Sequence, residues 1–250
     1  MDAAQHAIEE SAAYTAYRIM NVLQHPWPFP HLLFDQLLSP DLLDLLLRID
    51  IPNAAMRQHP PGEGAANREN HRFSVAVSPN TLQDVAAAIP TLGVAFTTLS
   101  HRLVVRALVE RFRHELEIGF GTTDLALQPS MVLVEDRSGY ELLPHTDVPQ
   151  KALTLIVYLA ADDADPSLGT ELYAFRGSPD GAPANIMQTR VARHWFNRVT
   201  TVPYRPNHGL AFAPSRNTFH GVGHVQTDTA VRRILQFQLN VDAAAASRRP

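Results

Sequence analysis

Three side chains in the second half of the sequence could bind one metal ion. His145 and Asp147 are two residues apart, and His220 follows after 72 intervening residues. In a β-strand, residues two apart leave the same face of a sheet, so this imidazole and this carboxylate could hold one ion together. Two imidazoles and one carboxylate on one side of a metal leave its other side open. This donor set is expected of a non-haem Fe(II) oxygenase rather than of a closed structural zinc site.

Arg233 is the candidate for binding an anionic cosubstrate. It lies 13 residues after His220, in a segment (231–241) whose odd positions are almost all apolar and whose even positions are mostly polar. A period of two therefore predicts that Arg233 shares an inner face with Leu235 and Phe237, while Arg232 points into solvent. A cation inside a barrel is costly unless it is paired, and a guanidinium matches a carboxylate with two parallel hydrogen bonds.

These segments resemble the iron(II)- and 2-oxoglutarate-dependent dioxygenases, in particular the branch that resembles prolyl hydroxylases. The resemblance covers about residues 128–242 and is much looser before them; the matching stretches are 139–147, 153–159, 169–173 and 220–222. It implies that His145, Asp147 and His220 hold Fe(II) and that the far carboxylate of 2-oxoglutarate meets Arg233. It also implies that O2 and 2-oxoglutarate are consumed, giving succinate and CO2, while an unactivated C–H bond is oxidised.

Two details of the resemblance concern the ligands. His224 would share a strand face with His220 and is therefore a rival for the third ligand. The stretch 217–222 matches the family's distal-histidine pattern much better, so His220 is preferred. Family members that add chloride to their substrate lack the carboxylate found here as Asp147. Its presence therefore favours hydroxylation over halogenation.

Substrate contacts are expected from the N-terminal part and from loops. His71 and Arg72 form a polar and cationic cluster after a long loop, and they either line the pocket or mark a loop-to-strand junction with Arg72 in water. Lys151 is the one lysine beside 20 arginines. It is either a solvated strand end or an ammonium for an anionic substrate at the pocket rim. Arg198 is a further candidate.

Composition limits the class of protein and its partners. The chain has 250 residues, of which 45% are hydrophobic, which suits one catalytic domain over residues 1–250. A net charge of −4 gives no broad basic surface, and the absence of cysteine excludes a disulfide scaffold and a thiolate metal site. We find no leader or long apolar run and expect a cytoplasmic, bacterial protein, monomer or homodimer, that acts on a small molecule and not on nucleic acid or a membrane.

The elements that must position these residues indicate an α+β fold with a mainly β core. Helices are predicted over 4–24, from Ser39-Pro40 onward, and as one long helix over 90–118 that ends at Gly119 and Gly121; residues 53–69 are predicted to form a loop, a candidate lid. We expect a double-stranded β-helix, a cupin-like jelly-roll, with N-terminal helices packed on one sheet. Its parts are residues 1–120, a core over 128–242 and a frayed tail over 243–250. Eight strands are predicted, over 131–134, 141–145, 152–159, 170–174, 198–202, 210–213, 219–225 and 231–241.

Three functional hypotheses remain open at this point. The first is a hydroxylase of a small molecule such as an amino acid, a sugar or a natural-product intermediate. The second keeps the chemistry but takes a peptidyl residue or a lipid-linked sugar as substrate, or ends in desaturation or ring closure. The third is a non-oxygenase cupin-like barrel that uses its metal for structure or hydrolysis. Arg233 argues against the third, because a hydrolase has no use for a buried cation placed after its metal-binding strand.

Overall fold

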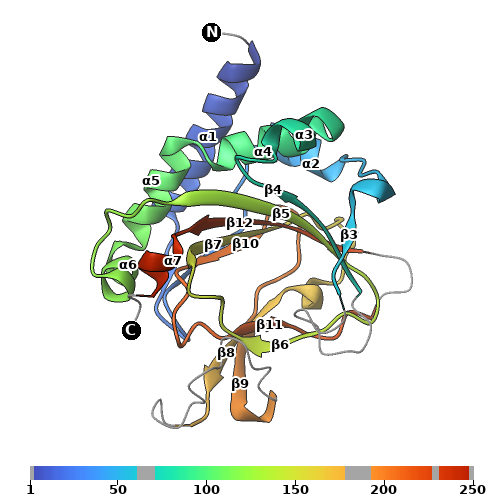
Figure 1. Cartoon of the computed structure of the whole chain (residues 1–250). Helices are drawn as coiled ribbons and strands as arrows, with labels where there is room; N and C mark the ends of the chain where they lie inside the picture. The colour runs from blue at the N-terminus through green and yellow to red at the C-terminus, as the bar shows by residue number, and fades with distance from the viewer. Residues whose placement is uncertain (1–2, 61–70, 178–192, 227–230, 248–250) are drawn as a thin grey trace.

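Two antiparallel sheets face each other in the part of the chain that the computed structural model describes, namely residues 3–60, 71–177, 193–226 and 231–247 (Figure 1). Within these residues the larger sheet has eight strands in the order β1-β2-β10-β7-β12-β5-β4-β3, and the smaller has four in the order β6-β11-β8-β9. Helices cover the outer face of the larger sheet. The predicted fold class, a double-stranded β-helix with N-terminal helices on one sheet, is confirmed.

All eight predicted strands are present. The first four strands of the structure come from the N-terminal half and extend the larger sheet; sequence analysis listed none of them, although one of its two alternatives for His71 and Arg72 was a loop-to-strand junction. The bounds are β1 (Gln24–His25), β2 (His31–Phe34), β3 (Arg57–Gln58), β4 (Arg72–Val77), β5 (Gln128–Asp136), β6 (Leu142–His145), β7 (Lys151–Tyr158), β8 (Thr170–Phe175), β9 (Phe196–Thr201), β10 (Gly209–Phe212), β11 (His220–Val222) and β12 (Arg232–Asn240).

The predicted helices are present with two corrections, and a further helix over residues 82–88 was not predicted. The single long helix is wrong: the chain bends by 49° between α4 and α5. His101 has extended backbone angles there, and its ring accepts a bond from Leu103 N. The frayed tail is also wrong as far as residue 246, because Asp242 caps a short helix by accepting from Ala245 N. The helices are α1 (Ala3–Asn21), α2 (Pro40–Leu47), α3 (Leu82–Ala88), α4 (Pro90–Leu99), α5 (Arg102–Arg111), α6 (Arg113–Phe120) and α7 (Ala243–Ala246).

Other expectations for the N-terminal part hold in part. Gly121, with φ of 73°, caps α6 in the left-handed conformation that glycine favours. The expected loop contains a 3-10 turn (Asn53–Ala55) and β3, and its remainder, 61–70, lies outside the described residues together with the question of a lid. None of the described helices is by itself long and apolar enough to span a membrane. The bent pair α4 and α5 is long and apolar enough only when its two helices are taken together.

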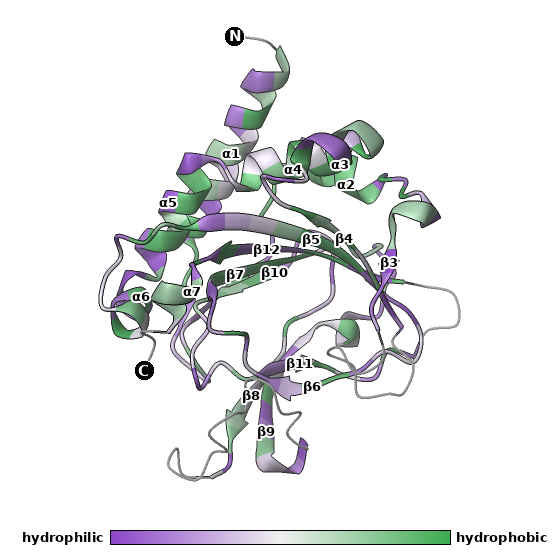
Figure 2. Cartoon of the chain, viewed as in Figure 1, coloured by the Kyte–Doolittle hydropathy of each residue, from purple (hydrophilic) through white to green (hydrophobic). Residues whose placement is uncertain are grey.

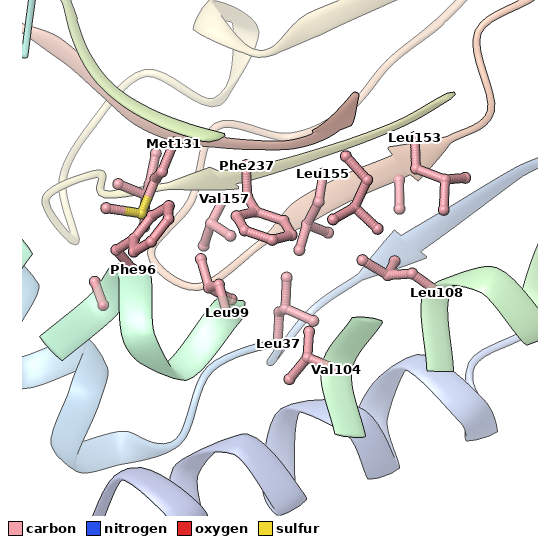
Figure 3. Packing of buried hydrophobic residues seen from close by; sticks show 14 of the residues in the cluster. Leu37, Phe96, Leu99, Val104, Leu108, Met131, Leu153, Leu155, Val157 and Phe237 are labelled. Carbon is pink, nitrogen blue, oxygen red and sulfur yellow. The ribbon is translucent and has the colours of Figure 1, made fainter. Parts of the chain in front are cut away.

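Both faces of the larger sheet are buried, one by the helices and the other by the smaller sheet. One face packs against the helices, where Phe237, Leu155 and Val157 meet Phe96 and Leu99 (Figure 3). The other face looks toward the smaller sheet and forms a separate cluster with its residues. Accordingly, the central strands β7 and β10 are mainly hydrophobic, whereas helices α1 and α5 carry hydrophilic stretches (Figure 2). The face toward the smaller sheet is the one that positions the candidate site.

Candidate metal centre

The structure brings the three predicted ligands together. His145 ends β6 and lies directly opposite His220, the first residue of β11, so both rings leave the same face of the smaller sheet. Their ring centroids are 4.4 Å apart. One donor atom from each of His145, Asp147 and His220 lies within 4.8 Å of the other two. Two nitrogens and one carboxylate oxygen at this spacing suit Fe(II).

Backbone carbonyls set the tautomer of both histidines. His145 Nδ1 lies 3.1 Å from the carbonyl oxygen of Leu143, and His220 Nδ1 lies 3.0 Å from that of Thr218. A carbonyl oxygen only accepts, so each Nδ1 carries the proton and each Nε2 keeps a free lone pair for a metal. Each carbonyl belongs to the residue two positions earlier in the chain, which strand geometry supplies.

Burial keeps both imidazoles neutral. Loss of solvation, followed by the neighbouring His220, lowers the pKa of His145 to about 3. The pKa of His220 is also lowered, again mainly by burial. A metal requires the neutral form of histidine, so the site is ready to bind without displacing protons from these rings at neutral pH.

Asp147 reaches the histidines by a route that sequence analysis did not foresee. The prediction that His145 and Asp147 share a strand face is wrong, because β6 ends at His145 and Asp147 lies in the connection to β7. Two residues of β7 hold its carboxylate instead: Lys151 Nζ donates to Oδ1 at 2.6 Å and Thr154 Oγ1 donates to Oδ2 at 2.8 Å. Burial alone would raise the pKa of Asp147, but Lys151 and the two imidazoles hold it well below its usual range.

The expected orientation of the two adjacent arginines is reversed. Arg232 is 1% exposed, whereas the side chain of Arg233 is 27% exposed and forms an ion pair with Glu135 at 2.6 Å. The period of two was correct, but the apolar positions of β12 face the helices and not the smaller sheet. Leu235 and Phe237 belong to the helix-side cluster, and Ile234 belongs to the cluster between the sheets. Arg232 shares the face of Ile234 and therefore points inward.

Arg232 belongs to a buried cluster with Arg72 and Asp136. Asp136, which is fully buried, accepts from Arg232 Nη1 at 2.6 Å and from Arg72 Nε and Nη2 at 2.6 and 3.0 Å. Arg232 Nε donates to the carbonyl oxygen of Leu168 at 2.5 Å. Its Nη2 is buried and has no hydrogen-bond partner among the described residues. Two guanidiniums therefore contact one carboxylate, and Arg232 keeps one unused buried donor among the described residues.

The other predicted site residues lie in different places. Arg72 is inside the barrel, so the alternative that placed it in water is wrong; its neighbour His71 lies against Gly139. Lys151 is paired with Asp147 and is not a solvated strand end. Arg198 is an exposed residue that pairs with Glu171 at 2.7 Å. Glu171 lies opposite Gly221, so this pair is on the other face of the smaller sheet from His220 and does not reach the metal centre.

Sequence analysis missed several residues around the site. Phe212 of β10 packs its ring 4.9 Å from the ring of His220. Gln236 and Gln238 on β12 lie opposite Ile156 and Thr154, which places both glutamines on the inner face. Both are partly exposed, and their side chains have no hydrogen-bond partner among the described residues. Their alternation with apolar residues was visible in the sequence, but it was assigned to the opposite face. His224 is exposed and lies outside the ligand cluster.

Comparison with solved structures identifies the fold. A prolyl hydroxylase from Trichoplax adhaerens, solved with a peptide fragment of the hypoxia inducible factor oxygen degradation domain, superposes with a TM-score of 0.53 at 10% identity, covering 99% of this chain and 96% of that chain. The chain has the prolyl-hydroxylase fold. At this identity the likeness concerns the fold, so the chemistry must be argued from the site.

Two further structures are similar with lower scores. A prolyl-4-hydroxylase from Pseudomonas putida has a TM-score of 0.49 at 11% identity, covering 93% of this chain and 100% of that chain. SnoN, a non-heme α-ketoglutarate-dependent epimerase of nogalamycin biosynthesis, has a TM-score of 0.49 at 17% identity, covering 95% of this chain and 82% of that chain. No protein-family model matches the chain, and no curated protein matches its sequence.

Proposed function

We propose that this protein is an Fe(II)- and 2-oxoglutarate-dependent oxygenase. The observation that carries the proposal is the pairing of two features on one barrel interior. A three-residue metal centre leaves coordination positions open, and the buried Arg232 on the facing sheet has a donor, Nη2, that no described residue uses. A dicarboxylate that chelates a metal at one end and carries a second carboxylate at the other matches both features.

The metal would be held by His145, Asp147 and His220. Iron, O2 and 2-oxoglutarate together supply the oxidation: succinate and CO2 are released, and a C–H bond of the substrate is hydroxylated. The protein orients the reactants and excludes water. Phe212 packs beside His220, so an aromatic ring lies next to the proposed metal site.

The distal carboxylate of 2-oxoglutarate would bind Arg232 in place of Arg233. Arg232 is a buried cation, and its Nη2 has no hydrogen-bond partner among the described residues. A buried donor without a partner is unfavourable, and a bound carboxylate would supply the missing acceptor. Arg233 is already paired with Glu135 on the opposite face of β12 and has no route to the interior.

The substrate would be a small molecule whose reacting part is polar and uncharged. Gln236 and Gln238 face the space between the sheets, and each side-chain amide offers both donors and an acceptor. Gln238 lies next to Thr154, which contacts Asp147, so this row of side chains adjoins the metal centre. Sugars, neutral amino-acid derivatives and natural-product intermediates provide matching groups.

Two other functions fit less of the structure. A hydrolase or a structural metal site would use the three ligands but would leave the unused buried donor of Arg232 unexplained. A peptidyl substrate with the same chemistry remains the second candidate. The free side-chain amides of Gln236 and Gln238 also suit a peptide backbone, which offers the same donors and acceptors.

The test measures succinate release from purified protein supplied with Fe(II), 2-oxoglutarate and O2. We expect slow release alone and faster release with the true substrate, found by adding pools of neutral sugars, amino-acid derivatives and short peptides. An anaerobic crystal soak with Fe(II) and 2-oxoglutarate should show metal on the three ligands and a carboxylate at Arg232. Metal bound elsewhere, or a carboxylate at Arg233, would contradict the assignment.

A further inference from the structure

The carboxylate of Asp147 accepts hydrogen bonds from two partners, of which one is charged and the other is neutral. Lys151 brings a full positive charge to Oδ1, and Thr154 brings a neutral hydroxyl to Oδ2. The side chain of Asp147 is 5% exposed and that of Lys151 is 17% exposed, so solvent screens this contact only weakly. Both partners come from β7, whose residues are buried along nearly the whole strand.

The two oxygens of Asp147 are therefore unequal as metal ligands. A carboxylate oxygen has two lone pairs, so an oxygen that accepts one hydrogen bond can still bind a metal. Next to Lys151, however, a divalent cation would meet the repulsion of the ammonium. Next to Thr154 it would meet no charge, and the hydroxyl would fix the direction of the remaining lone pair.

We infer that Lys151 and Thr154 are positioning residues that restrict Asp147 to one ligand oxygen. Oδ1 stays with Lys151, while Oδ2, oriented by Thr154, binds the metal. The inference rests on the proposed metal site and concerns how Asp147 binds there. A carboxylate that supplies one oxygen keeps a coordination position free, and the nearby ammonium weakens the hold on the metal. The metal centre therefore binds its ion less tightly, and one more coordination position stays open for other ligands.

Metal affinity measured without 2-oxoglutarate or O2 tests the electrostatic part. Mn(II) binding is titrated by following the spin-resonance signal of free Mn(II). Lys151→Met should tighten binding by about tenfold because it removes a nearby charge, and Lys151→Arg should stay near the wild-type value. Thr154→Val should weaken binding by about tenfold, and Thr154→Ser, which keeps a hydroxyl, should not. Unchanged or weaker binding in Lys151→Met overturns the inference, as does unchanged or tighter binding in Thr154→Val.

The number of water molecules on bound Mn(II) tests the one-oxygen part. It is counted from line broadening in isotopically labelled water. Lys151→Met should carry one water fewer than the wild-type protein, because Oδ1 becomes free to bind the metal. Lys151→Arg should keep the wild-type number, and an equal count in wild-type protein and Lys151→Met rules out the restriction.

Two controls separate the possible failures. Thermal unfolding of each metal-free variant shows whether a change in affinity reflects loss of the fold. His145→Ala in the same Mn(II) titration tests the proposed site itself, because it removes a ligand and not a positioning group. If His145→Ala binds Mn(II) normally, the metal site is wrong. If it abolishes binding while Lys151→Met behaves as wild type, the site stands and only the role of Lys151 is wrong.

Discussion

The two faces of strand β12 differ in what they do. The face toward the helices carries Leu235, Phe237 and Leu239, each at most 1% exposed, and forms the larger hydrophobic core. The face toward the smaller sheet carries a buried arginine and two glutamines whose side chains have no hydrogen-bond partner among the described residues. The more apolar face of this strand is therefore the structural one, and the polar face holds the chemistry. In a barrel covered by helices on one side, the strongest hydrophobic signal marks the helix contact.

The largest expected effect concerns the metal ligands, which face the polar side of β12 from across the barrel. His145→Ala removes one of three donors and should abolish metal-dependent succinate release. The assay is 2-oxoglutarate turnover with Fe(II), with and without substrate. Turnover at the wild-type rate in this variant would show that the oxidation, if any, occurs elsewhere.

The adjacent arginines test the assignment of the faces directly. Arg232→Gln should raise the 2-oxoglutarate concentration needed for half-maximal turnover by roughly 100-fold, because a charge-assisted hydrogen bond in a buried site is lost. Arg233→Gln should change it by less than about threefold, since the pair of Arg233 with Glu135 is on the other face. Thermal unfolding monitors the damage from leaving Asp136 with one partner fewer. The reverse order of effects would mean that β12 presents its odd positions to the cosubstrate.

The helix-side face should affect stability alone. Phe237→Ala leaves a cavity between β12 and α4 and should lower the free energy of unfolding by about 3–5 kcal/mol, as measured in urea. The 2-oxoglutarate requirement of the folded fraction should stay at the wild-type value. A change in the 2-oxoglutarate requirement of the folded fraction would place Phe237 in the site.

Acid should destabilise the metal-free protein through the polar interior. The ordinary pKa of His145 is 6.5 and its folded value is about 3, lowered by burial and by His220. Between these two pH values the unfolded chain binds a proton at His145 and the folded protein does not. The contribution of His145 to the free energy of unfolding is therefore complete above about pH 6.5 and is lost as the pH falls toward 3. The lowered pKa of Asp147 acts in the same direction at still lower pH. Urea unfolding at several pH values should show a steep loss in wild-type protein and a shallower one in His145→Gln.

The smallest expected change in stability concerns the two free glutamines. Gln236→Leu and Gln238→Leu should change the free energy of unfolding by less than about 0.5 kcal/mol, because neither side chain has a partner to lose. Once a substrate is known, each should raise its KM by about tenfold while leaving the 2-oxoglutarate requirement unchanged. A stability loss above 2 kcal/mol would show that these amides hold the fold and do not face the substrate.

The sequence predicted most of the elements and the three ligands, and it failed where long-range packing decides. Strands β5 to β12 were each recognised from local alternation and turn residues. The division of one long helix into α4, α5 and α6 was missed, because the apolar pattern continues through the bend at His101. β4 was not among the predicted strands, because its place in the sheet is set by its pairing with β5 and not by its own pattern.

The candidate ligand set and the fold class could thus be predicted from the sequence alone, because donor types and strand patterns are read from the residues themselves. The identity of the buried arginine was decided only by the tertiary structure. A period of two shows that Arg232 and Arg233 point to opposite faces, but it does not show which face meets the helices. The source of the groups that hold Asp147 was decided in the same way. Lys151 and Thr154 reach it because β6 ends at His145 and β7 lies in the facing sheet, and no spacing along the chain encodes that contact.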